Sequence, residues 1–98
     1  MQHMLCNAYM AVALHLLGDY VLQTDFIAKT KGQNWWHLLS HCLTYSLPFA
    51  LFFGIDWRII VLVTSHFIVD ALKARYSKID YVTDQLCHLA ILAIYVVI

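Results

Sequence analysis

Four apolar stretches dominate this chain, and each is close to the length of a membrane-spanning helix. They run over about residues 4–22, 35–54, 57–75 and 81–98. A helix needs about 20 such residues to cross a hydrocarbon core about 30 Å thick. Backbone groups cannot stay unpaired in lipid, and no stretch shows the alternation typical of a barrel strand. The pattern therefore predicts four transmembrane helices.

The composition supports a membrane protein. Of the 98 residues, 62% are hydrophobic and 12% are charged, whereas about 25% are charged in a typical soluble domain. So small a domain cannot bury this much apolar surface, so we expect the excess to face lipid. Six basic and six acidic residues give a net charge of zero, which excludes a nucleic-acid binder driven by bulk positive charge. We expect one domain over residues 1–98.

Loop charges predict the orientation. Basic residues gather in the first and third connections, at Lys29, Lys31, Arg75 and Lys78, with Lys73 at the border. The opposite side carries only Arg58. Because positive loops favour the cytoplasm, both termini should be non-cytoplasmic. The predicted fold is thus an all-α integral membrane bundle of four transmembrane helices.

Polar residues follow one pattern in all four stretches. Each stretch carries a histidine paired with an aspartate or a second histidine four residues away: His15 and Asp19, His37 and His41, His66 and Asp70, and Asp84 and His88. Residues four apart lie on one face of a helix. Counting 1.5 Å per residue puts all four pairs about 3–15 Å below the cytoplasmic boundary. A shared depth favours one common site over four separate ones.

These side chains have the chemistry of a metal centre. Imidazole and carboxylate groups bind zinc, iron and manganese, and a pair four residues apart can grip one ion. Ionisable groups inside a membrane are costly and mark functional sites. We therefore predict that all eight residues are metal ligands for a divalent cation, zinc foremost. They exceed the four ligands of one structural zinc, so one or two ions are expected.

Other interpretations of these residues stay open. The pairs could form hydrogen bonds between helices, or line a hydrated vestibule. Asp70 and Lys73 are the predicted catalytic residues; Lys73 could instead neutralise Asp70, hold a substrate phosphate or extend to the membrane surface. Gln23, Asp25 and Gln85 could orient the ligands or act as loop and cap residues.

The motifs His15-Leu-Leu-Gly-Asp19, His37-Leu-Leu-Ser-His41, His66-Phe-Ile-Val-Asp70-Ala-Leu-Lys73 and Asp84-Gln85-Leu-Cys-His88 resemble a known family. It is the small bacterial and phage membrane family called domain of unknown function 3307, and the resemblance extends from about Ala13 to the C-terminus. The chain is also distantly similar to membrane-bound metal-dependent hydrolases of bacteria under LexA control. The resemblance implies a compact four-helix protein of the bacterial inner membrane and supports the same His and Asp positions, but it supplies no activity.

Three functions follow as hypotheses. The first is a metal-dependent membrane hydrolase acting on a lipid-linked or amphipathic substrate, because the polar pairs lie near the depth of lipid headgroups. The second is a transport or binding protein for a metal or protons. The third is a non-enzymatic bacterial or phage membrane effector with a structural metal. Assembly into a homo-oligomer is left open.

Overall fold

The computed structural model describes residues 2–98, and every regular element in this range is helical. The elements are α1 (Gln2–Leu16), the π-helix η1 (Leu17–Val21), α2 (Asp25–Thr30), α3 (Trp35–Phe53), α4 (Trp57–Ala74) and α5 (Tyr81–Val97). The all-α class predicted from the sequence is therefore confirmed.

With η1 counted as the continuation of α1, the long helices agree with the four apolar stretches to within two residues at each end. The short helix α2 was not predicted, because residues 23–34 contain no extended apolar pattern. Its start is nevertheless capped, since Oγ1 of Thr24 accepts a hydrogen bond from the backbone N–H of Ile27 at 3.2 Å. Thr is a favoured N-cap residue.

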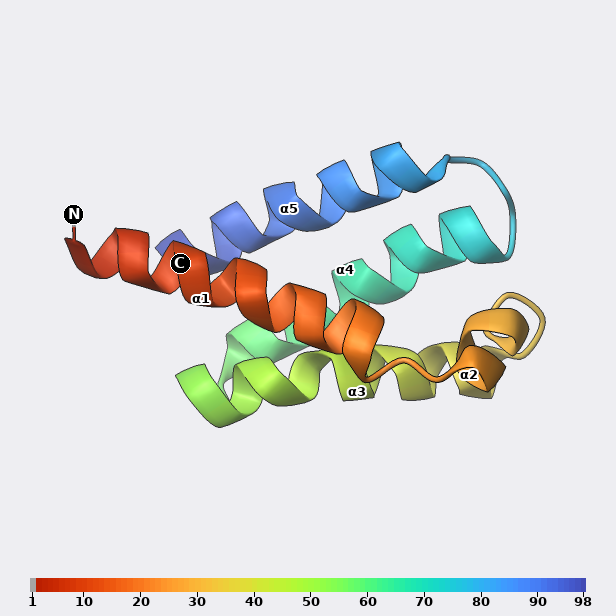
Figure 1. Ribbon diagram of the computed structural model, residues 1–98, viewed down its shortest axis with the longest axis horizontal. Helices are drawn as coiled ribbons and strands as arrows, with labels where there is room; N and C mark the ends of the chain where they lie inside the picture. Colours follow the sequence, from red (N-terminus) through yellow and green to blue (C-terminus); the bar gives the residue numbers. More distant parts are fainter. Residues whose placement is uncertain (1) are drawn as a thin grey trace.

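The four long helices form an elongated bundle measuring 41 × 24 × 23 Å (Figure 1). Helix α1 packs against α5, α5 against α4, and α4 against α3, while η1 closes the ring by packing on α3. Both termini and the α3–α4 turn lie at one end of the bundle (Figure 1). Helix α2 and the α4–α5 connection lie at the other end, which we call the loop end.

Polar caps define where the helices begin. The Asp56 carboxylate accepts the backbone N–H of Arg58 at 2.9 Å, and Asp80 accepts that of Thr83 at 2.8 Å. Hydrogen bonding to the Arg58 side chain lowers the pKa of Asp56, and the hydrogen bond from Thr83 lowers that of Asp80. Asp56 is the N-cap of α4, and Gly54 ends α3 with a φ of 89° that favours glycine.

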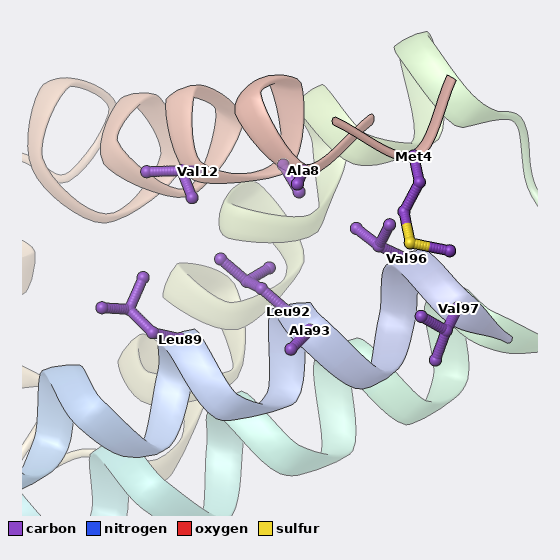
Figure 2. A pocket seen from close by; sticks show the side chains of 9 residues that line it. Met4, Ala8, Val12, Leu89, Leu92, Ala93, Val96 and Val97 are labelled. Atoms are coloured by element: carbon purple, nitrogen blue, oxygen red, sulfur yellow. The ribbon is translucent and has the colours of Figure 1, made fainter. Parts of the chain in front are cut away.

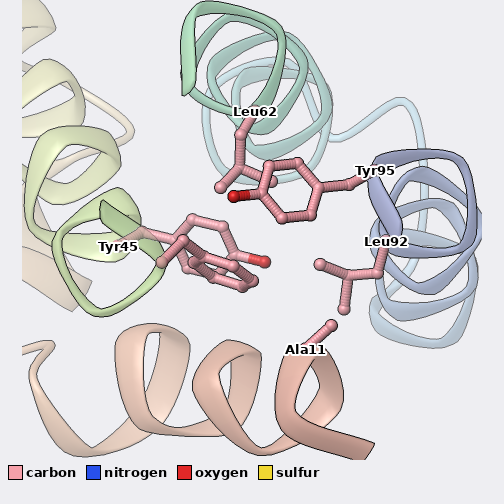
Figure 3. Close-up of a cluster of buried hydrophobic side chains, with 6 residues drawn as sticks. Ala11, Tyr45, Leu62, Leu92 and Tyr95 are labelled. Atoms are coloured by element: carbon pink, nitrogen blue, oxygen red, sulfur yellow. The ribbon is translucent and has the colours of Figure 1, made fainter. Parts of the chain in front are cut away.

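Aromatic and aliphatic side chains fill the half of the bundle nearest the termini (Figure 3). This cluster consists of Ala11, Tyr45, Phe49, Leu62, Leu92 and Tyr95. An apolar groove of about 290 Å³ runs beside it between α1 and α5, lined by residues such as Met4, Ala8 and Leu89 (Figure 2). The larger apolar cluster therefore occupies the end near the termini, and a smaller one of Leu38, Cys42 and Ala71 packs toward the loop end.

The outer surface is strongly apolar, with Leu51, for example, 79% exposed. By length and composition, one segment of the described chain, His3–Val21, can cross a membrane. Helix α5 is apolar but shorter, and α4 carries the charged residues Arg58, Asp70 and Lys73. Among residues 2–98 this criterion thus selects one candidate span where the sequence pattern predicted four.

Candidate metal centre

The centre begins at the π-helix that ends the first long helix. The backbone N–H of Leu22 donates to the carbonyl of Leu17 at 2.9 Å, which closes the wider turn of a π-helix. Single π turns are frequent at functional sites. A Cβ on Gly18 would lie 2.8 Å from the backbone oxygen of Tyr45. Glycine therefore lets η1 approach α3 closely and carries the Asp19 carboxylate into the bundle.

A first group of ligand atoms comes from three elements. Oδ1 of Asp19 in η1 lies 3.2 Å from Nε2 of His41 in α3 and 3.6 Å from Nε2 of His66 in α4. The two imidazole nitrogens lie 3.1 Å apart. Oδ2 of Asp70 lies 3.2 Å from Nε2 of His41 and 3.9 Å from Nε2 of His66. All four residues are buried.

The spacing of these atoms fits a tetrahedral metal ion. Oxygen and nitrogen ligands lie about 2.0–2.2 Å from zinc, which places the ligand atoms about 3.3 Å from one another in a tetrahedron. The separations among Asp19, His41 and His66 range from 3.1 to 3.6 Å. These three side chains can therefore hold one ion, and Asp70 lies beside the two histidines.

A second group consists of Asp19, Asp84 and His88, whose ligand atoms lie within 4.8 Å of one another. Oδ1 of Asp84 and Nε2 of His88 are 3.2 Å apart, yet neither atom has a hydrogen-bond partner in the described structure. Buried polar atoms are nearly always paired, so this arrangement fits a cation. Because Asp19 belongs to both groups, its carboxylate could bridge two ions.

Gln85 connects the second group to its surroundings. Its amide nitrogen donates to Oδ2 of Asp19 and to Oδ2 of Asp84, each at 3.1 Å. Its oxygen lies 3.0 Å from Nε2 of His15, whose Nδ1 lies 2.7 Å from the hydroxyl of Tyr45. Such contacts fix the orientation of ligands, which is one of the two roles considered for Gln85 from the sequence.

Two lysines add positive charge to the centre. The ammonium of Lys31 lies 2.8 Å from Oδ2 of Asp70, and this lysine is only 4% exposed. The side chain of Lys73 is 26% exposed; its ammonium lies 3.5 Å from Oδ2 of Asp84 and 3.9 Å from Oδ1 of Asp70. The two ammonium groups thus pair with Asp70 and Asp84, and the Asp19 carboxylate has no lysine partner in the described structure.

Six of the eight predicted ligands converge in the two groups: Asp19, His41, His66, Asp70, Asp84 and His88. His15 lies outside both and reaches them through Gln85. His37 also lies outside: its Nδ1 is 2.6 Å from Oγ1 of Thr30, and the residue is partly exposed. The geometry thus brings six of the eight predicted ligands together, and metal binding by them stays a prediction.

The remaining polar candidates have local roles. The amide of Gln23 donates to the backbone oxygen of Asp19 at 3.3 Å, and Asp25 is exposed in the first turn of α2.

The sequence alone did not predict two residues of the centre. Tyr45 is buried and stacks on His66 with ring centroids 3.8 Å apart, and Lys31 was counted only as a loop charge.

Fold and site together define a small helical protein with buried histidines and aspartates at one end of its bundle. The family described as protein of unknown function, DUF3307, matches residues 8–98. The chain therefore belongs to this family, as its motifs predicted. No curated protein and no solved structure matches the chain.

Proposed function

We propose that this protein is a metal-dependent hydrolase embedded in the bacterial inner membrane, with one or two divalent cations, zinc foremost, in its centre. One observation carries the proposal. Asp19 is shared by two buried groups of ligand atoms, one completed by His41 and His66 and the other by Asp84 and His88. Neighbouring ions that share a carboxylate are typical of two-metal hydrolytic sites.

The distribution of side chains supports four membrane-spanning helices. Large apolar side chains point outward from each long segment, among them Val21, Leu51, Ile60 and Leu86. The charged groups of the centre face inward. An apolar exterior around a paired polar interior is what a bilayer requires of a helical protein. On this proposal the basic loop end faces the cytoplasm and both termini face outward.

The proposed chemistry is hydrolysis of an ester at the loop end. A bound divalent cation would polarise the substrate oxygen and make water more acidic. Asp70 accepts a proton from water, and the water oxygen forms a bond to the phosphorus or carbonyl carbon of the substrate. The ester bond to the leaving oxygen then breaks, and that oxygen takes up the proton that Asp70 accepted. Lys73, partly exposed between Asp70 and Asp84, donates to an anionic oxygen of the substrate.

The position of the centre favours a lipid-linked or amphipathic substrate. Asp19 lies in η1 at the loop end of the first long segment, His66 lies in the loop-end half of α4, and Asp84 lies in the first turn of α5. On the proposed orientation this is near the depth of lipid headgroups. The opposite half of the bundle is filled by the apolar cluster around Phe49 and Leu62, which argues against a transport path for ions.

A non-enzymatic membrane effector with a structural metal is the second candidate. The first group supports it, because Asp19, His41, His66 and Asp70 together offer four ligand atoms. Structural zinc sites are closed by four protein ligands, whereas catalytic sites keep one position open. The two candidates thus differ in whether Asp70 binds the metal.

The test is purification in detergent without chelator, followed by elemental analysis and by hydrolysis assays on phosphate-ester and carboxyl-ester lipids. We expect at least one divalent ion per chain and turnover that falls at least 100-fold in Asp70→Asn, the loss expected when a general base is removed. Asp25→Asn is the matched control, because Asp25 is exposed and away from the centre. Absence of metal would overturn both candidates, and metal without turnover would favour the effector.

A further inference from the structure

We propose that Lys31 holds Asp70 away from the metal, so that the first group binds an ion through Asp19, His41 and His66 and keeps one position open for water. This inference rests on the proposed metal centre. It assigns Lys31, a residue outside the four long helices, as a positioning residue for the general base.

The contact between Lys31 and Asp70 is close and fully enclosed. The ammonium of Lys31 lies 2.8 Å from Oδ2 of Asp70, the same oxygen that lies 3.2 Å from Nε2 of His41. A buried ammonium is strongly disfavoured unless a charged partner compensates for its lost hydration. Lys29, two residues earlier, is exposed instead. The side chain of Lys31 therefore points into the bundle, whereas that of Lys29 does not.

The backbone around Lys31 fixes this position. Its N–H donates to the carbonyl of Ile27 at 2.9 Å. A Cβ on the next residue, Gly32, would overlap the backbone oxygen of Ala74, and the Arg75 guanidinium donates to the carbonyl of Gly32 at 3.4 Å. The connection after α2 is thus packed directly on the end of α4, one turn beyond Asp70.

The two oxygens of Asp70 have different surroundings. Oδ2 is held by Lys31, whereas Oδ1 is buried without a hydrogen-bond partner in the described structure. A lysine bound to Oδ2 weakens the attraction of that oxygen for a cation, because the ammonium repels the incoming charge. Oδ1 remains free to accept a proton. Lys31 thereby favours a base over a fourth ligand, and three protein ligands with an open position are typical of catalytic zinc.

The test measures zinc affinity by competition with a chromophoric chelator in Lys31→Met, with Lys29→Met as the matched control. We expect Lys31→Met to bind zinc at least tenfold more tightly than the wild type, because Asp70 becomes the fourth ligand. The absorption spectrum of the cobalt-substituted Lys31→Met variant should also differ from that of the cobalt-substituted wild type. A purely structural role for Lys31 would weaken zinc binding instead. Lys29→Met should match the wild type.

A double-mutant cycle separates ligand exchange from simple loss of charge. In the Asp70→Asn background, Lys31→Met should have little effect on zinc affinity, because the freed carboxylate is absent. If Lys31→Met does not fold, Gly32→Ala gives the same test, since its Cβ would displace the connection from Ala74. Tighter binding that persists in the Asp70→Asn background would overturn the inference, and so would unchanged or weaker binding in the single variants. Failure of the wild type to bind zinc would overturn the metal centre itself.

Discussion

Oδ1 of Asp19 lies 3.2 Å from Nε2 of His41, across the interface between η1 and α3. This contact depends on Gly18, where a Cβ would lie 2.8 Å from the backbone oxygen of Tyr45. The backbone of the π-helix can therefore approach α3 only when residue 18 lacks a side chain. The glycine before Asp19 thus determines whether the Asp19 carboxylate reaches His41 and His66.

Gly18→Ala should weaken both the fold and the metal site. The added methyl group must push η1 away from α3, because the nearest atom is backbone and cannot rotate aside. Overpacking of this kind costs roughly 1–3 kcal/mol. Thermal melting in detergent should show a lower transition, with reduced metal content. Leu51→Ala, at an outward-facing position of α3, is the control; equal melting of Gly18→Ala and this control would contradict the packing argument.

The shared position of Asp19 predicts an unequal loss of metal. Asp19→Asn removes a charged ligand from both groups, whereas His88→Ala removes one from the second group alone. If two ions bind, elemental analysis should find that His88→Ala retains one ion per chain and that Asp19→Asn retains none. Retention of the same ion by both variants would mean that Asp19 does not bridge the groups.

The converging residues were predictable because helix ends fix depth. His41, His66 and Asp84 all lie in the loop-end halves of their helices, and their partners four residues away share the same faces. Those two facts do not determine the contacts of His37. Its place in the first turn of α3 brings it into contact with Thr30 in α2, a helix that the apolar pattern of the sequence does not predict.

Lys31 and Tyr45 were missed for different reasons. A lysine in a connection is normally solvated, and only the packing of Gly32 on Ala74 turns this one inward. Tyr45 carries an ordinary aromatic side chain whose stacking on His66 depends on the crossing of α3 and α4. The π-helix also has no sequence signature of its own, so the position of Asp19 relative to His15 could not be derived from regular spacing.

The two histidines of α3 should behave differently on substitution. His41→Ala removes a ring nitrogen that lies within 3.2 Å of both Asp19 and Asp70, so zinc affinity should fall at least tenfold. His37→Ala removes only the contact with Thr30 among the hydrogen bonds of its ring, and zinc affinity should stay near that of the wild type. Chelator competition measures both. An equal fall in the two variants would restore His37 as a ligand.

Cysteine labelling tests the proposed orientation. In a background without Cys6, Cys42 and Cys87, Lys29→Cys and Ile55→Cys place single thiols at exposed sites at opposite ends of the bundle. A membrane-impermeant reagent added outside cells should label position 55 and not position 29, because the proposed orientation places the basic loop end in the cytoplasm. The reverse pattern would invert the topology, and labelling of both would argue against a spanning bundle.

A melting series with and without chelator distinguishes metal ligands from hydrogen-bonding residues. His66 belongs to the first group, whereas His15 contacts Tyr45 and Gln85 and reaches the metal positions only through the latter. A metal stabilises the fold only through its preference for the folded state. His66→Ala should therefore lower the melting temperature strongly in metal-loaded protein and much less after chelation. His15→Ala should lower it by a similar amount in both conditions.

The double variant His15→Ala/His66→Ala completes this series. Its loss of stability after chelation should come mainly from His15, because the lost hydrogen bonds to Tyr45 and Gln85 do not require a metal. In loaded protein the two losses should add, since the variants disrupt different interactions. His3→Ala, near the exposed start of α1, should leave melting unchanged in both conditions. If the stability losses of His15→Ala and His66→Ala depend equally on the metal, both histidines act on the same ion. If neither loss depends on chelation, the centre is a set of hydrogen bonds between helices.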